Sequence, residues 1–487
     1  MKTHFNILTV TILFLLSAKT FANCFFEFDA DKVFSSSFEE IICNKQFYFE
    51  QTSVDTIISG TSDHVVLQKT ITVTEMSKLL VISDGRFDPL NGPAGFLRIK
   101  INGDDQYSSY AIHDWSTGTS GLSGQHSFNV MAYREVPAGS YTISLVASAH
   151  PSNDGDFRVG SLSSMSIMLD PSMKIVNSSF RGETGNIDVT TYDPPTVDIN
   201  EGDADRPYVE VLSNDITNTV SSQSNVLSFV TGRAFLSCPG EGDALWGFWA
   251  DNMCQATSEA SWGVNDLYSG AETQSNMYAH SIYSLSHLES LNIKFGASEL
   301  AFGTDQANSP SGSHENDVCY KVGDANLLTM LNDNISGGVG GNSTFCSTYV
   351  WKCVATTIGH PGCPSANTDV TLGSQIINIP TDHSGVMFFS AKTRIQGGSE
   401  DDEDMVVSLG IKIDGVRVGS VGVQQLYTPN TASSRSLSAS YLSAVGSNSA
   451  PLSPGQHTIE AYINVATTGA GHPSVPEEVV LTYFDFD

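Results

Sequence analysis

Short stretches in which apolar and polar residues alternate recur along the whole chain. In one of them, Ile99 and Ile101 lie on one face of an expected strand while the intervening Lys100 lies on the other, which is the two-residue period of a half-buried strand. Asn102-Gly103 follows, and this pair favours the positive φ angles of a tight hairpin turn. Because similar runs and turns fill most of the sequence without amphipathic helices, the pattern predicts an all-β fold of jelly-roll-like sandwiches.

The same strand pattern occurs three times, which predicts tandem copies of one β-sandwich unit. The copies lie at residues 96–103, 318–324 and 409–415. Each copy precedes a second strand-like run and a His-Pro pair. Aligning the copies places Ile99, Tyr320 and Ile411 at equivalent core positions, so the expected architecture is three sandwiches in a row.

The predicted boundaries follow the composition of the chain. Its first residues combine a basic start at Lys2, an apolar run and the small residues that signal peptidase requires, so they are expected to be a secretory signal. An acidic, proline-containing stretch is expected to link the first two units. The predicted division is signal peptide 1–22, β-sandwich unit 23–185, linker 186–207, disulfide-rich unit 208–372 and third unit 373–487.

Charge and hydropathy limit the expected location of the protein and the partners that it can bind. The apolar run of the leader is too short to cross a bilayer and no second long run follows, so we expect no transmembrane segment and a secreted protein, extracellular or periplasmic. The formal net charge is −30, from 23 basic and 53 acidic residues. Such a surface repels nucleic acid, and it suits divalent cations as counter-ions.

Cysteine usage supports the oxidising compartment. An even count of eight in an exported chain favours disulfides over a metal site. Cys24 is expected to pair with Cys43, and Cys238 with Cys254, while the remaining four leave three connectivities open. The full set is Cys24, Cys43, Cys238, Cys254, Cys319, Cys346, Cys353 and Cys363. The middle unit is also expected to contain short helical turns around residues 285–291 and 326–331.

Two acidic clusters are candidate calcium sites, because calcium takes several carboxylate and carbonyl oxygens from loops. The first comprises Glu400, Asp401, Asp402 and Asp404, just before the third strand copy. The second comprises Asp84, Asp88 and Asn91, where the apolar run 79–82 is expected to end in a turn. Calcium is the one cofactor that the sequence suggests, and the alternative is a solvated run of charge.

Aromatic residues beside polar ones are the candidate ligand-binding groups. Tyr107, Tyr110 and Trp115 flank His113 and Asp114 in a polar stretch after the first strand copy. A second group, Trp246 and Trp249, lies between two cysteines. An exposed ring can cover the apolar face of a sugar while polar neighbours bind its hydroxyls, and the alternative is core packing.

No motif identifies a reaction. The chain has no nucleophile elbow or phosphate-binding loop, and residues 314–318 begin like a zinc-protease motif but lack its second histidine. We therefore expect a secreted, non-catalytic binding protein whose repeated units attach to a glycan, the extracellular matrix or a cell surface, since repeats gain avidity without chemistry. The alternatives are a polysaccharide-degrading enzyme with a carboxylate pair and a structural or assembly protein.

Overall fold

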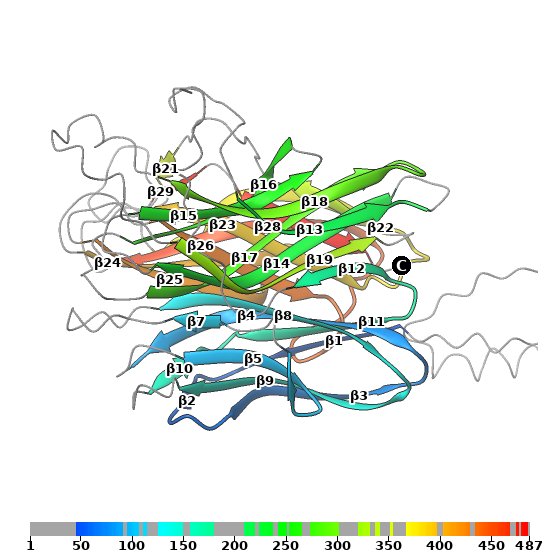
Figure 1. The fold of residues 1–487 in the computed structure, drawn as a ribbon, viewed down its shortest axis with the longest axis horizontal. Helices are drawn as coiled ribbons and strands as arrows, with labels where there is room; N and C mark the ends of the chain where they lie inside the picture. Colours follow the sequence, from blue (N-terminus) through cyan, green and yellow to red (C-terminus); the bar gives the residue numbers. More distant parts are fainter. Residues whose placement is uncertain are drawn as a thin grey trace, which may run out of the picture.

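The computed structural model describes most of the chain. The described residues are 45–90, 95–106, 111–113, 125–149, 156–179, 209–219, 224–236, 242–250, 253–264, 273–300, 320–331, 337–340, 351–353, 367–396, 403–428, 434–467, 474–476 and 479–485. Within these ranges all regular structure is β, with thirty strands and no helix (Figure 1). The predicted all-β fold is confirmed.

Two sheets come mainly from residues 46–170. The first inner sheet has the order β2-β10-β4-β11-β1-β27, with β8 also paired to β4. Its strands are β1 (Gln46–Gln51), β2 (Thr56–Ile58), β4 (Ser77–Pro89), β8 (His126–Val136), β10 (Phe157–Val159), β11 (Ser164–Asp170) and, from much later in the chain, β27 (Val445–Gly446). The first outer sheet contains β3 (His64–Val73), β9 (Gly139–Ala149), β5 (Gly95–Ile101), β6 (Asp104–Asp105) and β7 (Ala111–His113).

Two four-stranded sheets follow. The second inner sheet has the order β12 (Lys174–Ser179), β19 (Tyr320–Leu331), β14 (Ser224–Leu236), β17 (Thr273–Leu285). The second outer sheet has the order β13 (Val209–Thr217), β18 (Ser290–Leu300), β15 (Gly242–Ala250), β16 (Met253–Val264). β12 falls inside the stretch 23–185 expected for the first unit, yet it pairs with β19.

The last two sheets complete the pattern. The third inner sheet contains β20 (Gly337–Gly340), β30 (Val479–Asp485), β23 (Met387–Gln396), β29 (Ser474–Pro476), β21 (Trp351–Cys353) and β26 (Ser434–Leu442). The third outer sheet has the order β22 (Val370–Ile379), β28 (Gly455–Thr467), β24 (Glu403–Ile413), β25 (Val416–Thr428). β20 and β21 precede residue 373, the expected start of the third unit, but pair with β30 and β29.

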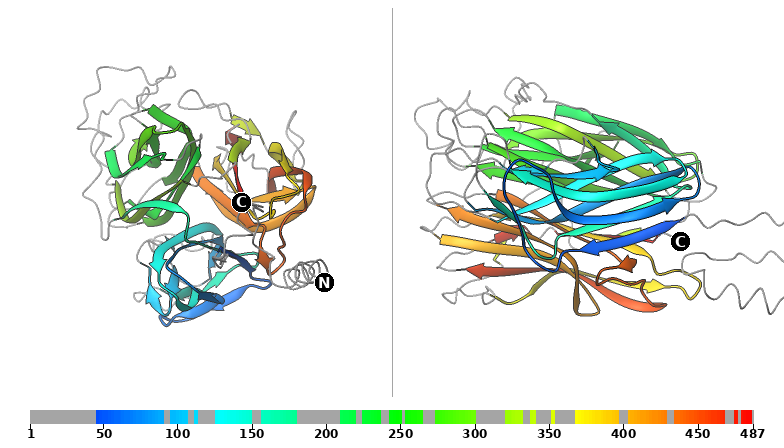
Figure 2. Two further views of the ribbon diagram at one scale, coloured as in Figure 1. Left: turned by 90° about the vertical axis from the view of Figure 1, so that its right-hand side faces the viewer. Right: turned by 90° about the horizontal axis from the view of Figure 1, so that it is seen from below.

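One strand order occurs in all three pairs of sheets. The outer sheets contain the series β3-β9-β5, β13-β18-β15 and β22-β28-β24, and the inner sheets contain β1-β11-β4-β8, β12-β19-β14-β17 and β20-β30-β23-β26. Figure 2 shows the three pairs grouped around a common centre. The repetition is therefore one of strand connectivity, and it extends across the described part of the chain.

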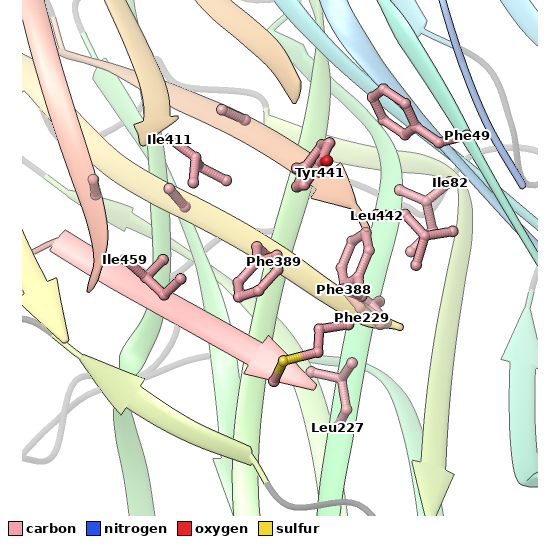
Figure 3. Close-up of a cluster of buried hydrophobic side chains, with 14 of the residues drawn as sticks. Phe49, Ile82, Leu227, Phe229, Phe388, Phe389, Ile411, Tyr441, Leu442 and Ile459 are labelled. Carbon is pink, nitrogen blue, oxygen red and sulfur yellow. The ribbon is translucent and has the colours of Figure 1, made fainter. Parts of the chain in front are cut away.

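The inner sheets share one hydrophobic core. A first cluster, which includes Ile99 and Ile143, fills the space between the first inner and outer sheets. A second cluster joins side chains from all three inner sheets, among them Ile82, Phe229 and Phe388 (Figure 3). The rings of Phe229 and Phe388 meet edge to face at 6.0 Å. Burial of these side chains stabilises the contact between the pairs of sheets as well as each pair itself.

Each pair of sheets uses a strand of its outer sheet to contact the inner sheet of the next pair, in the same sense around the centre. β7 of the first pair packs against β17 of the second, β16 of the second packs against β26 of the third, and β25 of the third packs against β4 and β8 of the first. β27 adds a direct link, because Val445 and Gly446 pair in parallel with Tyr48 and Phe49 of β1. This head-to-tail closure is the arrangement of a cyclic trimer made within one chain.

The expected helical turns of the middle unit are wrong. Residues 326–331 belong to β19, and residues 285–291 cover the end of β17, a tight turn with Leu288 at φ 62° and the start of β18. Residues 322–331 are buried throughout, so the strand lacks the alternation that separates it from a helix. A short apolar run without a period does not distinguish the two.

The prediction that residues 318–324 form a strand equivalent to the other two copies is also wrong. Ile99 and Ile411 lie in β5 and β24, at the same place in the strand order of their sheets, whereas Tyr320 starts β19 in an inner sheet. Gly323 and Asp324 do not close a hairpin: Asp324, at φ 42°, lies where the register between β14 and β19 shifts. The pair therefore marks a β-bulge rather than a turn.

Candidate functional site

The hairpins of the first and third outer sheets use the same turn chemistry. Asn102-Gly103 has φ angles of 53° and 85°, and Asp414-Gly415 has 52° and 79°. In the first, the Thr142 amide donates to Asn102 Oδ1 at 2.7 Å, and in the third the Thr458 amide donates to Asp414 Oδ1 at 2.8 Å. The expected tight hairpin turn is confirmed at Asn102-Gly103, and Asp414-Gly415 forms the same kind of turn.

The lysine of each hairpin is held by an aspartate that precedes the first strand of the sheet. Lys100 forms an ion pair with Asp63, and Lys412 Nζ lies 2.9 Å from Asp369 Oδ2. Arg417 also binds Asp369, at 2.6 Å, and both cations lie over the ring of Tyr462. These cations are therefore already neutralised by carboxylates of the chain.

The third hairpin contains an ionisable pair that the first lacks. His457 Nδ1 lies 2.7 Å from Asp414 Oδ2, and its Nε2 lies 2.8 Å from the Ser453 carbonyl. Desolvation alone would lower the pKa of His457, but its hydrogen bonds to Ser453 and Asp414 raise it above the ordinary 6.5. In the first outer sheet Tyr141 occupies the position that His457 has in the third, since each directly precedes the threonine that binds the turn. The Tyr141 hydroxyl donates to the Pro137 carbonyl oxygen.

A polar chain crosses the centre of the molecule. On β4 the face toward the other inner sheets starts with Leu80 and Ile82, which lie in the shared core, and continues with Asp84. Ser440 of β26 donates to Asp84 Oδ2, so the contact joins the first and third inner sheets. Ser440 lies opposite Ser390 on the neighbouring strand β23.

Two side chains of the second inner sheet complete this series of polar side chains. Tyr278 Oη lies 3.1 Å from Ser390 Oγ and 3.1 Å from His280 Nδ1, and both Tyr278 and His280 belong to β17. We call Asp84, Ser440, Ser390, Tyr278 and His280 the central polar chain. Its five side chains come from all three inner sheets and are all buried.

Burial sets the protonation of the central polar chain. Desolvation raises the pKa of Asp84 to about 7, against the opposing effect of its bond to Ser440. Burial also lowers the pKa of His280 to about 3, with a smaller contribution from the charge of Lys392. Desolvation likewise raises the pKa of Tyr278. Tyr278 and His280 are therefore neutral at neutral pH, and Asp84 becomes neutral as the pH falls below about 7, because burial disfavours the charged form.

Beyond the central polar chain, the same face of β4 becomes charged. Arg86 Nη2 lies 3.3 Å from Asp55 Oδ1, and Arg158 donates through Nε to Asp88 Oδ2 at 2.8 Å. Desolvation raises the pKa of Asp88 even though Arg158 and Arg86 oppose the rise. Glycine at position 85 allows β4 to lie this close to Ser163, since a Cβ there would lie 2.7 Å from the Ser163 backbone.

The aromatic candidates are only partly described. Tyr107, Tyr110, Asp114 and Trp115 lie outside the described residues. His113 ends β7, where its backbone pairs with Gly95. Trp246 and Trp249 lie in β15, opposite Ala260 and Cys254 of β16, and ligand binding by them stays a prediction.

The structure describes the two acidic clusters to different extents. Glu400, Asp401 and Asp402 lie outside the described residues, and Asp404 belongs to β24. In the second cluster Asn91 lies outside the described residues. The turn expected after residues 79–82 is wrong, because β4 continues to Pro89, with Asp84 bound to Ser440 and Asp88 to Arg158. Among the described residues no group of three or more His, Cys, Asp or Glu side chains could hold a metal ion.

The predicted cysteine pairings stay predictions. Cys254 lies in β16 and Cys353 in β21, and the structure describes their backbone only. The other six cysteines lie outside the described residues, as do the leader 1–22 and the linker 186–207. In the ranges that the structure covers, no helix is long and apolar enough to cross a membrane.

Sequence reasoning missed the central polar chain. It expected a turn at Ser83-Asp84-Gly85, whereas β4 runs through these residues. The alternation of Leu80, Ile82, Asp84, Arg86 and Asp88 was the available signal, because a continuing two-residue period indicates one long strand. The partners Ser440 and Tyr278 carry no comparable signal, since nothing local indicates which sheets meet.

Comparisons with known proteins leave the chain without a family. No family model and no curated protein matches it. Among solved structures, PNGF-II matches at 8% identity over 84% of this chain and 99% of its own, with a TM-score of 0.26. The VP2 subviral particle of infectious bursal disease virus matches at 8% identity over 91% and 79%, with a TM-score of 0.18. Likenesses this weak support no conclusion about activity.

Proposed function

We propose that the chain is an exported, non-catalytic binding protein made of three jelly-roll-like sandwiches, residues 46–170, 174–331 and 337–485. The three act as one rigid platform that attaches to a glycan, the extracellular matrix or a cell-surface component. The observation that carries this proposal is the head-to-tail packing of β7, β16 and β25 around a shared core.

The packing supports binding because it fixes three similar modules relative to one another. Modules held rigidly can engage a repetitive ligand together, which raises avidity without a new contact. The strand order shared by the three pairs of sheets supports the same interpretation. The neutralised cations Lys100 and Lys412 argue against attraction of acidic polymers through these lysines.

A binding screen tests the proposal. The full exported chain is applied to immobilised neutral and acidic glycans and to matrix proteins, and any hit is followed by an assay for newly formed reducing ends. The proposal predicts retention without release of reducing ends. Binding to none of these ligands, or cleavage of a glycan, would contradict it.

A single substitution locates the ligand site. Trp115→Ala is expected to reduce retention on a glycan hit by about tenfold, the loss of one stacking ring. Trp262→Ala is the matched control, because it removes a tryptophan outside the predicted ligand group. Equal retention of both variants and the wild type would place the site elsewhere.

A further inference from the structure

A layer of polar side chains crosses the three inner sheets next to the apolar layer that they share. The third strand of the common order, β4, β14 or β23, has an apolar residue of the shared core and, two positions further along the same face, a polar one. The apolar residues are Ile82, Phe229 and Phe388 (Figure 3), and the polar ones are Asp84, Thr231 and Ser390. All three polar residues are buried.

The neighbouring strands extend this layer with further buried polar side chains at the same register. These are Asn129, Ser164, Tyr278, Asn326 and Ser440. Two contacts within the layer join different sheets: Ser440 donates to Asp84 Oδ2, and Tyr278 Oη lies 3.1 Å from Ser390 Oγ. The layer therefore lies where the three inner sheets meet.

Two neighbouring oxygens of this layer have no hydrogen-bond partner among the described residues. They are Asp84 Oδ1 and Asn129 Oδ1, and the two residues are 0% and 1% exposed. Asp84 and Asn129 lie directly opposite each other on β4 and β8, which places their side chains side by side on the same face of the sheet. Both atoms accept hydrogen bonds, so neither can satisfy the other.

The charge of Asp84 also lacks a counterpart on this face of β4. Arg86, two residues further along, forms an ion pair with Asp55, and Arg158 forms one with Asp88. Burial raises the pKa of Asp84 to about 7, although its hydrogen bonds to Ser440 favour the ionised form. Above that pH the carboxylate is ionised, and a buried charge needs a counter-charge close to it.

We propose that a sodium ion binds between Asp84 and Asn129 at the meeting point of the three inner sheets, with the carboxylate as its anionic ligand and the amide oxygen as a neutral one. Carboxylate and amide oxygens are donors that hard cations take in proteins. A monovalent ion balances the single carboxylate, whereas a divalent ion would leave a buried excess of positive charge. Because Asp84 also binds Ser440 of the third inner sheet, the ion stabilises closure of the first inner sheet against the third.

Urea unfolding at pH 8.5 tests the proposal, with sodium chloride replacing choline chloride at constant ionic strength. The wild-type folding equilibrium constant should rise by up to about tenfold for each tenfold increase in sodium, because one ion binds the folded state. Asp84→Asn keeps the shape of the side chain and removes its charge, so its folding constant should not depend on sodium.

The matched control is Asp88→Asn, which removes a carboxylate four residues along the same strand that binds Arg158. This variant should keep the wild-type dependence on sodium. Equal wild-type folding constants in sodium and in choline would overturn the proposal, and so would an undiminished sodium dependence in Asp84→Asn.

A second comparison needs no variant to fold. Protons and the cation compete for the Asp84 carboxylate, whose pKa is about 7. The sodium dependence of the wild type should therefore disappear at pH 5, at the same ionic strength. The same dependence on sodium at pH 5 and at pH 8.5 would overturn the proposal.

Discussion

The inner and outer sheets of the molecule differ in which faces they bury. In the outer sheets, β5 alternates buried and half-buried residues, and β22 alternates between buried or half-buried and exposed ones. In the inner sheets, β11 is buried at every residue, and so are residues 387–393 of β23. A sheet buried on both faces must be covered on each, and the inner sheets are covered by one another. The contrast shows that the three pairs of sheets form one body.

The largest effect should follow loss of an inner-sheet ring. Phe388→Ala removes a buried side chain that contacts Phe229 across the centre, and should lower the free energy of unfolding by about 3–5 kcal/mol. Hydrogen exchange should accelerate in inner strands of all three pairs, because they share its core. The matched control is Ile143→Ala in the first outer sheet, whose core lies within one pair. Acceleration confined to the third pair in Phe388→Ala would contradict the shared core.

A smaller effect should follow disruption of the β27 contact. A Cβ at Gly446 would lie 1.7 Å from the Phe49 carbonyl oxygen, so Gly446→Ala must separate β27 from β1. The expected cost is about 1–3 kcal/mol, as for overpacking of a close contact. Gly139→Ala, where a Cβ would make only an ordinary contact with the Tyr141 ring at 3.4 Å, is a control for substitution at a glycine without crowding. Faster exchange in β1 of Gly446→Ala but not of Gly139→Ala is the expected readout.

A pH-dependent effect should distinguish the hairpin of the third outer sheet from that of the first. Because the pKa of His457 is raised, its contribution to stability is full below 6.5 and is lost as the pH rises through the folded value. The protection factor of the Thr458 amide, which corrects for the intrinsic rise of exchange with pH, should therefore fall above that range, while the protection factor of Thr142 beside Asn102 should not. His457→Gln should remove the difference between the two hairpins. Equal pH profiles in the wild type would show that the pair is not coupled to the turn.

The smallest effect is expected on the exposed face of an outer sheet. Ile376 is 59% exposed on β22, so Ile376→Thr should change the free energy of unfolding by no more than about 0.5 kcal/mol. A β-branched residue is kept, which preserves the preference for a strand. A loss of several kcal/mol on thermal or urea unfolding would mean that this face is covered in solution.

The local sequence pattern was sufficient to predict a strand and its turn where one face of the strand is exposed to water. Alternation and an Asn-Gly pair placed the hairpin at residues 102–103, because these signals depend on neighbours in sequence, and the similar run 409–415 has the same strand and turn in the structure. The pattern failed for β19, because residues 322–331 are buried throughout and have no polar period. It also failed for β4, where the turn-like residues Ser83-Asp84-Gly85 follow an apolar run although the two-residue period continues to Asp88. The central polar chain depends on which sheets meet, and no local residue records that Asp84 will contact Ser440.

The most direct test of the shared core is native-state hydrogen exchange as a function of low denaturant concentration. Amides of β4, β14 and β23, one strand from each inner sheet, should converge on the same opening free energy, because the three sheets unfold as one cooperative unit. Three separate opening free energies for these strands, each with its own denaturant dependence, would contradict the account.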